Sequence, residues 1–393
     1  MKKSTKRILL SAGEASGDLH AANLVQKVKR LNPHITFYGI GGDLMRKEGV
    51  NILVDVNNLS IIGFLEIITK FTQIRQAFRI MVNKLLRDKP DLLILVDYPG
   101  FNLRLAKVAK KLGVRVLYFI SPKIWAWHQS RAKIVKKYVD VMAVIFPFEV
   151  DFYKQWQVPA IFVGNPLLKM VTTKLTPPAA RRALNLKPNS QVIGLFPGSR
   201  IRELKYLLPT MLATTELLAK QNPNIEFLLP QAHSITDAEL QKYLSTNSRK
   251  IHVIKQRNYE VMQACDAIIA ASGTVTLEIA LMGIPLVITY KTSWLEYQIA
   301  KLLLKIPYIG LCNILAKQEI APEILQNDAT AKNIAKEIQQ ILQDPTYRNN
   351  MLTHSQKIKD LLSQNVQITI EQLVIKMLNK KIMPYAAAIQ AKK

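Results

Sequence analysis

The sequence predicts an α/β protein with two domains, each built on a parallel sheet. Short apolar runs alternate with longer helical stretches, as in strands that are joined by crossover helices. The 393 residues exceed the roughly 250 to 300 at which a single core stops growing. Two consecutive prolines, Pro177 and Pro178, interrupt this pattern, which then starts again. We therefore expect two similar domains with a cleft between them.

The predicted strands are the apolar runs bounded by turn residues. They are 7–10, 35–40, 92–96, 114–119, 141–146 and 160–163 in the first domain, and 192–196, 226–229, 252–254, 267–270 and 285–289 in the second. The expected domains cover 1–175 and 176–345. Helices over 346–378 are expected to return to the first domain, and 379–393 is a basic tail.

Composition favours a protein of a reducing compartment. Its two cysteines, Cys265 and Cys312, stand in apolar sequence and form neither a disulfide framework nor a zinc-ligand spacing. The basic N-terminus precedes an apolar run of only three residues, which is too short for a signal peptide. No stretch reaches the roughly 18 uncharged apolar residues that a membrane-spanning helix needs. We expect a cytoplasmic protein.

The net charge of +26 indicates an anionic partner, either nucleic acid or a negatively charged membrane surface. Segment 59–87 favours the membrane, because it is crowded with aliphatic residues and interrupted by cations, with Glu66 as its one acidic residue before Asp88. The predicted membrane contacts are Ile61, Ile62, Phe64, Leu65, Ile68 and Phe71. A helix buried wholly in the core is the alternative. Nucleic acid fits less well, because its binders interleave aromatic and basic groups on a polar face.

The first candidate site follows the predicted strand 7–10, where two glycines alternate with polar residues. Its polar side chains are Glu14, Ser16, Asp18 and His20, and Gly13 and Gly17 allow close approach of a ligand. Open α/β sheets bind substrates beyond the carboxyl ends of their strands, which is where this loop is predicted to lie. A helix N-terminus capped by Ser16 or Asp18 is the alternative.

Two loops of the second domain have the composition of phosphate-binding loops. Gly198, Ser199 and Arg200 follow one strand and can offer backbone N–H groups, a hydroxyl and a guanidinium to phosphate. Ser272, Gly273 and Thr274 follow another, and Glu278 lies one turn into the next helix, where it can bind ribose hydroxyls. The alternatives are an ordinary turn, helix capping and a solvated carboxylate. Together, the loops favour a nucleoside diphosphate.

These motifs jointly resemble one enzyme family, the lipid-A-disaccharide synthases, which are glycosyltransferases of the GT-B type (family 19). The segments that carry the resemblance are 12–20, 39–42, 96–102, 121–127, 146–149, 197–200 and 272–278. They occur in the family's order between about residues 8 and 330. The resemblance implies two Rossmann-like domains with parallel sheets facing across a cleft.

The resemblance also implies the reaction. UDP-2,3-diacylglucosamine would donate its sugar to the 6-hydroxyl of 2,3-diacylglucosamine 1-phosphate, which forms a β-1′,6 disaccharide and releases UDP. This is a step of lipid A synthesis in Gram-negative bacteria. Because both substrates carry acyl chains held in the inner leaflet, the enzyme would associate peripherally with the cytoplasmic face of the inner membrane, whose anionic surface suits a cationic protein.

An α-linked donor that gives a β-product requires inversion, and inversion requires a base for the acceptor hydroxyl. Asp97, at the end of the predicted strand 92–96, is the expected base, with a turn-forming role beside Pro99 as its alternative. Glu14 and Asp18 are rival bases. The residues expected to bind substrate are Ser16, Gly17, His20 and Asn313, and those expected to bind UDP are Gly198, Ser199, Arg200, Ser272, Gly273, Thr274 and Glu278. No cofactor or metal is expected, because no Asp-x-Asp motif occurs.

Two positions depart from the family pattern. Asn165 stands where the family usually has histidine, and asparagine does not titrate near neutrality. Cys312 replaces a proline before Asn313, which removes a constraint on the turn. Three other functions are therefore retained: another UDP-sugar enzyme of the same architecture, an inactive UDP-sugar or lipid-binding regulator, and, on charge alone, a nucleic-acid-binding protein. A homodimer is possible.

Overall fold

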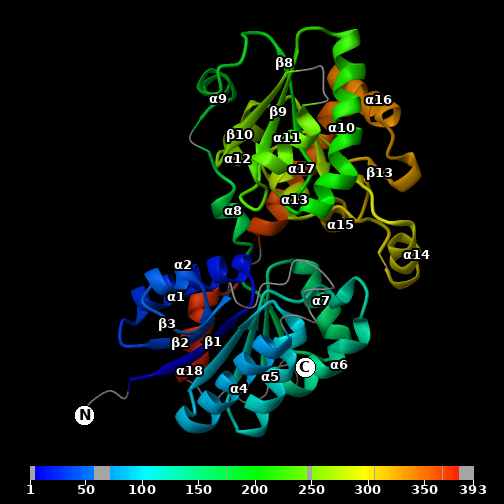
Figure 1. Cartoon of the computed structure of the whole chain (residues 1–393). Coiled ribbons are helices and arrows are strands. Elements are labelled where there is room, and N and C mark those ends of the chain that lie inside the picture. The colour runs from blue at the N-terminus through cyan, green and yellow to red at the C-terminus, as the bar shows by residue number, and fades with distance from the viewer. Residues whose placement is uncertain are drawn as a thin grey trace. The chain divides into compact units, whose positions relative to one another are not determined.

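The computed structural model describes residues 5–56, 71–173, 175–245, 250–304, 306–364 and 366–379. The chain forms two compact units (Figure 1), the first from residues 1–166 and 364–393 and the second from residues 167–363. Each unit is a parallel sheet with helices on its faces, as the alternating sequence pattern predicts.

The first unit has a seven-stranded sheet in the order β3-β2-β1-β4-β5-β6-β7. Its strands are β1 (Arg7–Ala12), β2 (Thr36–Gly41), β3 (Asn51–Asp55), β4 (Leu92–Val96), β5 (Val116–Phe119), β6 (Val141–Val144) and β7 (Ala160–Phe162). Neighbouring strands in this order pair in parallel. The six strands predicted for this unit are confirmed, and the edge strand β3 is an addition. It was missed because its side chains are only partly buried, so no long apolar run marks it.

Helices cover both faces of this sheet. They are α1 (Ala15–Leu31), α2 (Asp43–Lys47), α4 (Phe71–Asp88), α5 (Pro99–Lys111), α6 (Ala132–Tyr138), α7 (Pro147–Gln155) and α18 (Ile370–Asn379), with two 3₁₀ turns, η2 (Lys123–Trp125) and η3 (Gln129–Arg131). Alternate strand residues enter different cores. Leu9 packs in the core that includes residues of α4, α5 and α6, whereas Ile8 and Leu10 pack in the core that includes residues of α1 and α18.

The second unit has a six-stranded parallel sheet in the order β10-β9-β8-β11-β12-β13. Its strands are β8 (Gln191–Phe196), β9 (Ile225–Gln231), β10 (Ile251–Lys255), β11 (Ala267–Ala271), β12 (Leu286–Tyr290) and β13 (Glu323–Leu325). Its helices are α8 (Leu167–Met170), α9 (Pro177–Ala183), α10 (Ile201–Gln221), α11 (Asp237–Leu244), α12 (Asn258–Ala264), α13 (Thr274–Leu281), α14 (Trp294–Leu303), α15 (Leu311–Ala316), α16 (Ala331–Gln343) and α17 (Pro345–Ser363), with the 3₁₀ turn η4 (Gln326–Asp328). The three-residue edge strand β13 was not predicted, because it is too short to form a periodic signal.

Strand order places one switch point in each sheet. β1 pairs with β2 on one side and with β4 on the other, and β8 pairs likewise with β9 and β11. Crossover connections therefore diverge between β1 and β4 in the first sheet and between β8 and β11 in the second. The loops that follow these strands leave room for a ligand at the carboxyl edge of each sheet. The candidate loops of both units follow these four strands.

The C-terminal helices divide between the two units. Both were expected to return to the first domain, but α17 packs on α13, α15 and α16 within the second unit. Only α18 packs on α1 in the first unit, where Leu373, Val374 and Met377 are buried. The sequence could not separate them, because both are ordinary helices with one apolar face.

Five of the six predicted membrane contacts fall outside the described residues. These five are Ile61, Ile62, Phe64, Leu65 and Ile68. The sixth, Phe71, is the first described residue of α4 and is 58% exposed. Farther along, α4 buries Ala77, Met81 and Leu85 against its own unit. Among the described helices, none is long and apolar enough to cross a membrane.

Candidate functional sites at the two switch points

The first site is built from the loops that follow β1 and β4. The register pairs Ala12 with Val96, so the next residues of the two strands, Gly13 and Asp97, emerge side by side. Gly13 lies against the ring of Tyr98, where an added Cβ would come within 2.2 Å of the ring atom Cδ1. Only glycine fits there, and the two loops are consequently packed into one surface.

Asp97 and Tyr98 both adopt the left-handed backbone region, with φ of 45° and 49°. Two successive non-glycine residues in this region are costly, so other contacts must hold them in place. The Asp97 carbonyl accepts hydrogen bonds from the Tyr118 hydroxyl at 2.5 Å and from Asn102 Nδ2 at 2.7 Å. Both donors fix the turn that aims the Asp97 carboxylate.

Asn102 and Ser11 form a buried link between the two strands. The Ser11 hydroxyl donates to Asn102 Oδ1 at 2.6 Å, while Asn102 Nδ2 donates to carbonyls at the end of β4. Neither residue was predicted to have a role. The available signal was a polar residue at an apolar position, since Ser11 is fully buried within β1 and Asn102 is fully buried in α5.

Burial and charge make Asp97 a stronger base than an ordinary carboxylate. The pKa of Asp97 is raised to about 6, chiefly by burial and secondly by the negative charge of Glu14. A hydrogen bond from the Tyr98 backbone and the charge of Lys123 act in the opposite direction. The charges of Glu14 and Lys123 thus both act on Asp97, and Lys123 was not among the predicted site residues.

Asp18 has a different environment from the other two acids. Its carboxylate accepts backbone N–H groups from Gly42 at 2.6 Å, Leu44 at 3.1 Å and Met45 at 3.2 Å, at the N-terminus of α2. Both oxygens are engaged and the side chain is buried. This is the geometry of a capping residue that fixes the loop after β2, rather than that of a base.

The other predicted residues of this loop lie on the first turns of α1. Ser16 is exposed. A Cβ added to Gly17 would lie 3.4 Å from the Ala12 side chain. Burial lowers the pKa of His20, so this imidazole is neutral near pH 7. Within the described part of the chain, its buried Nδ1 has no hydrogen-bond partner.

A buried carboxyl holds the segment that contains Lys123. Glu149 accepts hydrogen bonds from Trp125 Nε1 at 3.1 Å and from the Phe146 backbone at 3.2 Å. Burial raises the pKa of Glu149 to about 8, so it carries a proton at neutral pH. Glu149 therefore joins α7 to the turn η2.

The loop after β8 is filled by an internal carboxylate. Glu203 Oε2 accepts the backbone N–H groups of Ser199 at 3.0 Å and Arg200 at 3.2 Å, and Glu203 Oε1 lies 3.2 Å from Arg200 Nη1. Gly198, at φ +104°, passes so close that an added Cβ would lie 2.2 Å from Glu203 Oε2. The N–H groups expected to face phosphate are therefore already satisfied. The missed signal was an acid three residues after the N-cap Arg200, which is the capping-box spacing.

The loop after β11 is open by comparison. An added Cβ on Gly273 would meet no atom within 4 Å, and Thr274 is exposed at the start of α13. The Ser272 hydroxyl is already engaged, because it donates to the Ile309 carbonyl at 2.8 Å. The first N–H groups of a helix lack partners within the helix, so the N-terminus of α13 can receive an anion.

Glu278 lies on α13 beside Tyr259. The two side chains share a hydrogen bond, burial raises the pKa of Glu278, and burial together with the charge of Glu278 raises the pKa of Tyr259 to about 12. The acid is thus held in one orientation near the open loop of its own unit, as a ribose ligand requires.

Asn313 is placed inside the fold. Its Nδ2 donates to the Ala321 carbonyl at 2.7 Å and to Glu323 at 2.8 Å, while its Oδ1 accepts the backbone N–H groups of Ile320 and Ala321. The side chain is fully buried and its hydrogen-bonding capacity is used within the protein. The structure therefore gives Asn313 a turn-holding geometry instead of the direct substrate contact that we expected.

The two departures from the family pattern are also buried. Asn165 donates to the Ile145 carbonyl at 3.1 Å, and burial raises the pKa of Cys312 to about 12. Neither side chain supplies an exposed titratable group near neutral pH. Among the described residues, no group of three or more His, Cys, Asp or Glu side chains could hold a metal ion.

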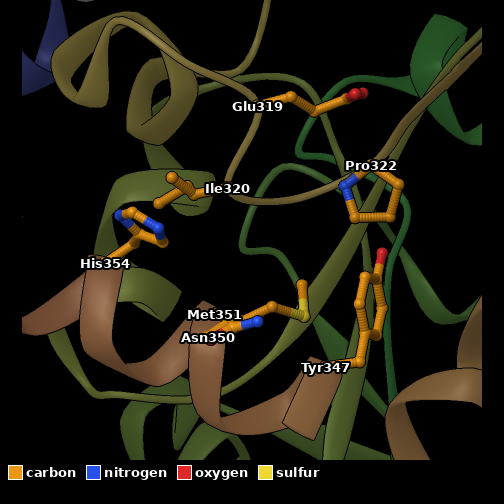
Figure 2. A pocket seen from close by; sticks show the side chains of 7 residues that line it. All are labelled: Glu319, Ile320, Pro322, Tyr347, Asn350, Met351 and His354. Carbon is orange, nitrogen blue, oxygen red and sulfur yellow. The ribbon is translucent and has the colours of Figure 1, made fainter.

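A separate cavity of about 430 Å³ lies in the second unit (Figure 2). It is lined by the turn that Asn313 holds and by α17, through Glu319, Ile320, Pro322, Tyr347, Asn350, Met351 and His354. His354 Nδ1 lies 2.6 Å from Gln318 Nε2 at this turn. None of the predicted site residues lines the cavity.

Comparison with known proteins decides the family. A sequence profile described as lipid-A-disaccharide synthetase matches residues 8–377. The chain belongs to this family. It is 44% identical over 377 residues to the lipid-A-disaccharide synthase of Geobacter metallireducens, with 96% of this chain and 98% of that protein covered. It is 49% identical over 352 residues to the enzyme of Trichlorobacter lovleyi, with 89% and 92% covered.

Solved structures of low sequence identity share the fold of this chain. One is a UDP-GlcNAc 2-epimerase from Neisseria meningitidis bound to UDP-GlcNAc, with a TM-score of 0.59, 15% identity and coverage of 91% of this chain and 100% of that one. Another is MurG of Acinetobacter baumannii, with a TM-score of 0.56, 14% identity and coverage of 95% and 99%. The architecture is therefore the GT-B type, as the resemblance implied.

The Ser11–Asn102 link should be measurable by a double-mutant cycle. We expect Ser11→Ala and Asn102→Ala each to lower the free energy of unfolding of the first unit by about 1–3 kcal/mol, because each leaves a buried partner unsatisfied. Their effects should couple by at least about 0.5 kcal/mol. Urea unfolding, monitored through hydrogen exchange of the β1 and β4 amides, measures both the stability loss and the coupling.

Thr276→Val provides the control for this cycle, since Thr276 is a buried hydroxyl of the second unit with its own hydrogen bonds. Its effect should add to that of Ser11→Ala without coupling. Strict additivity of Ser11→Ala and Asn102→Ala would contradict a shared buried network.

Proposed function

We propose that the chain transfers 2,3-diacylglucosamine from UDP-2,3-diacylglucosamine to the 6-hydroxyl of 2,3-diacylglucosamine 1-phosphate. The products are the β-1′,6-linked disaccharide 1-phosphate, a lipid A precursor, and UDP. Family membership supports the reaction. The observation that carries it to particular residues is the pair of acids, Asp97 and Glu14, at the β1–β4 switch point, with the pKa of Asp97 raised to about 6.

Asp97 serves as the general base. Its carboxylate takes the proton of the acceptor hydroxyl while that oxygen attacks the anomeric carbon of the donor. The bond from this carbon to the UDP phosphate oxygen breaks on the opposite side, which inverts the centre and leaves the electron pair on UDP. A base with a pKa of about 6 is mostly ionised at neutral pH and is a better proton acceptor than an ordinary carboxylate.

The remaining residues of the first site position or contact the acceptor. Glu14 increases the basicity of Asp97 through its charge, and Ser16, Gly17 and His20 border the same loop on α1. Asp18 acts through the loop after β2, whose N–H groups it binds. We therefore rank Asp97 first, Glu14 second and Asp18 last among the candidate bases.

The second unit binds UDP. The open N-terminus of α13, with Gly273 and Thr274, receives the diphosphate, and Glu278 accepts hydrogen bonds from ribose hydroxyls. Arg200 supplies a cation, because its side chain is 70% exposed and only loosely paired with Glu203. Gly198, Ser199 and Ser272 shape the two loops. A cationic and dipolar site of this kind stabilises the departing UDP without a metal ion.

The enzyme associates with the cytoplasmic face of the inner membrane through segment 59–87. Support comes from the net charge of +26, the acylated substrates that this function implies, and the exposure of Phe71 at the start of α4. The partners are then the two acylated sugars and an anionic lipid surface, and nucleic acid has no role.

Filling the open loop should block UDP. Gly273→Val introduces a side chain into space that holds no protein atom, so the fold should tolerate it while UDP affinity falls at least about tenfold, or about 1.4 kcal/mol. Isothermal titration with UDP in EDTA measures this. Gly100→Val is the matched control, because its added side chain also meets no atom but lies in the first unit. Equal UDP affinity in the two variants would contradict UDP binding at the loop before α13.

The acid limb of the pH profile should reveal the base. Activity requires ionised Asp97, so kcat/KM should fall as the pH drops through about 6. Glu14→Gln removes a charge that raises the pKa of Asp97, so the limb should move to lower pH while activity at pH 8 is largely kept. Asp43→Asn, which removes an exposed carboxylate of α2, should not move it. Loss of all activity in Glu14→Gln would instead identify Glu14 as the base.

The reaction itself is tested with purified protein and both acylated sugars in mixed micelles containing EDTA. Wild type should form the disaccharide 1-phosphate, and the isosteric variant Asp97→Asn should be slower by at least about a hundredfold. Hydrogen exchange of the β1 and β4 amides of the same variant reports whether the first unit is folded, and UDP titration reports on the second. A wild type that binds UDP without forming product would overturn the transferase and favour a binding role.

A further inference from the structure

Helix α14 presents its apolar residues to solvent. The helix has 10 residues, and none of them is buried. The exposed apolar residues are Trp294 at 73%, Leu295 at 62%, Ile299 at 47%, Leu302 at 85% and Leu303 at 41%. Isolated apolar residues on a surface are ordinary, but five of them on one short helix form a patch that needs an explanation.

The patch is one face of the helix. At about 100° per residue, these five positions fall within roughly half of the helix circumference. The opposite half contains Glu296, Tyr297 and Ala300, which are less exposed and therefore face the protein. Surface helices normally bury the apolar face, as α16 does with Ile334, Ile338 and Ile341. The amphipathic orientation of α14 is thus inverted.

Polar contacts hold α14 in this orientation. The Glu296 carboxylate lies 2.5 Å from the Arg202 guanidinium of α10 and 2.9 Å from the Ser293 hydroxyl, and it also accepts from Thr292. Because Glu296 lies on the half opposite the exposed apolar residues, these contacts favour the orientation in which the apolar half faces outward. They also neutralise the one acidic residue of α14 and leave its Lys301 as an exposed cation.

We propose that α14 docks on an anionic phospholipid bilayer and inserts Trp294, Leu295, Ile299 and Leu302 among the headgroups. An apolar face with a cation at its border and a tryptophan at its end has the composition of an interfacial helix. The charge of +26 attracts an anionic surface and opposes close approach of a second copy. This docking surface belongs to the second unit and is separate from segment 59–87 of the first.

Vesicle binding by the full chain tests the proposal without any need for the reaction. A variant with Trp294, Leu295, Ile299 and Leu302 each changed to Ser should bind vesicles of equal parts phosphatidylcholine and phosphatidylglycerol at least about tenfold more weakly than wild type. The matched control changes three exposed apolar residues elsewhere, Leu31, Ile134 and Leu361, to Ser and should bind like wild type. UDP titration of both variants reports on the fold of the second unit.

Insertion is read out separately by tryptophan quenching. Brominated lipids in the same vesicles should quench wild-type fluorescence, and Trp294→Phe should remove most of that quenching while Trp127→Phe, which removes another exposed tryptophan, should not. Phenylalanine keeps the apolar surface, so binding itself should persist. Unchanged vesicle affinity in the four-residue variant would overturn the proposal. A change in sedimentation with unchanged vesicle affinity would overturn it in favour of a contact between copies.

Discussion

The geometry of the first site depends on the buried amide of Asn102. It joins the ends of β1 and β4 through Ser11 and the backbone of Asp97, at the point where the crossover connections diverge. A parallel sheet brings the loops together but does not orient their side chains. The left-handed turn at Asp97 does so, and this conformation persists because Asn102 and Tyr118 bind its carbonyl. The basicity of Asp97 follows from the same arrangement, since the turn holds its carboxylate in a poorly solvated position near Glu14.

Both units use internal carboxylates where backbone N–H groups converge. Asp18 binds the N–H groups at the start of α2, and Glu203 binds those of Ser199 and Arg200 before α10. A helix N-terminus attracts any anion, and a side chain tethered nearby competes well with one in solution. The two loops of the second unit differ in this respect. The loop before α10 is already occupied, whereas Gly273 leaves the start of α13 accessible.

Much of the fold could be predicted from the sequence, because buried parallel strands are continuous apolar runs. β3 and β13 escaped because an edge strand is short or half exposed and lacks such a run. The site was predicted as a set of residue types rather than as geometry. Glu14, Asp97, Gly273 and Glu278 lie where their motifs indicated, but Asp18 and Asn313 face inward to bind backbone. At Asp18, no sequence pattern distinguishes a carboxylate that awaits substrate from one that caps a helix distant in sequence, because both roles select the same residue types near strand ends.

The path of the chain between the units also affects how the protein forms during translation. The second unit is encoded as one continuous stretch, 167–363, whereas the first needs α18 from the far end of the chain. A ribosome has therefore released every residue of the second unit before the first unit can complete the core in which Leu373 and Val374 pack against α1. The half of the protein that contains the proposed base begins synthesis first but cannot complete its core until α18 has been made. Until then, the apolar face of α1 that α18 covers remains open to water and to chaperones.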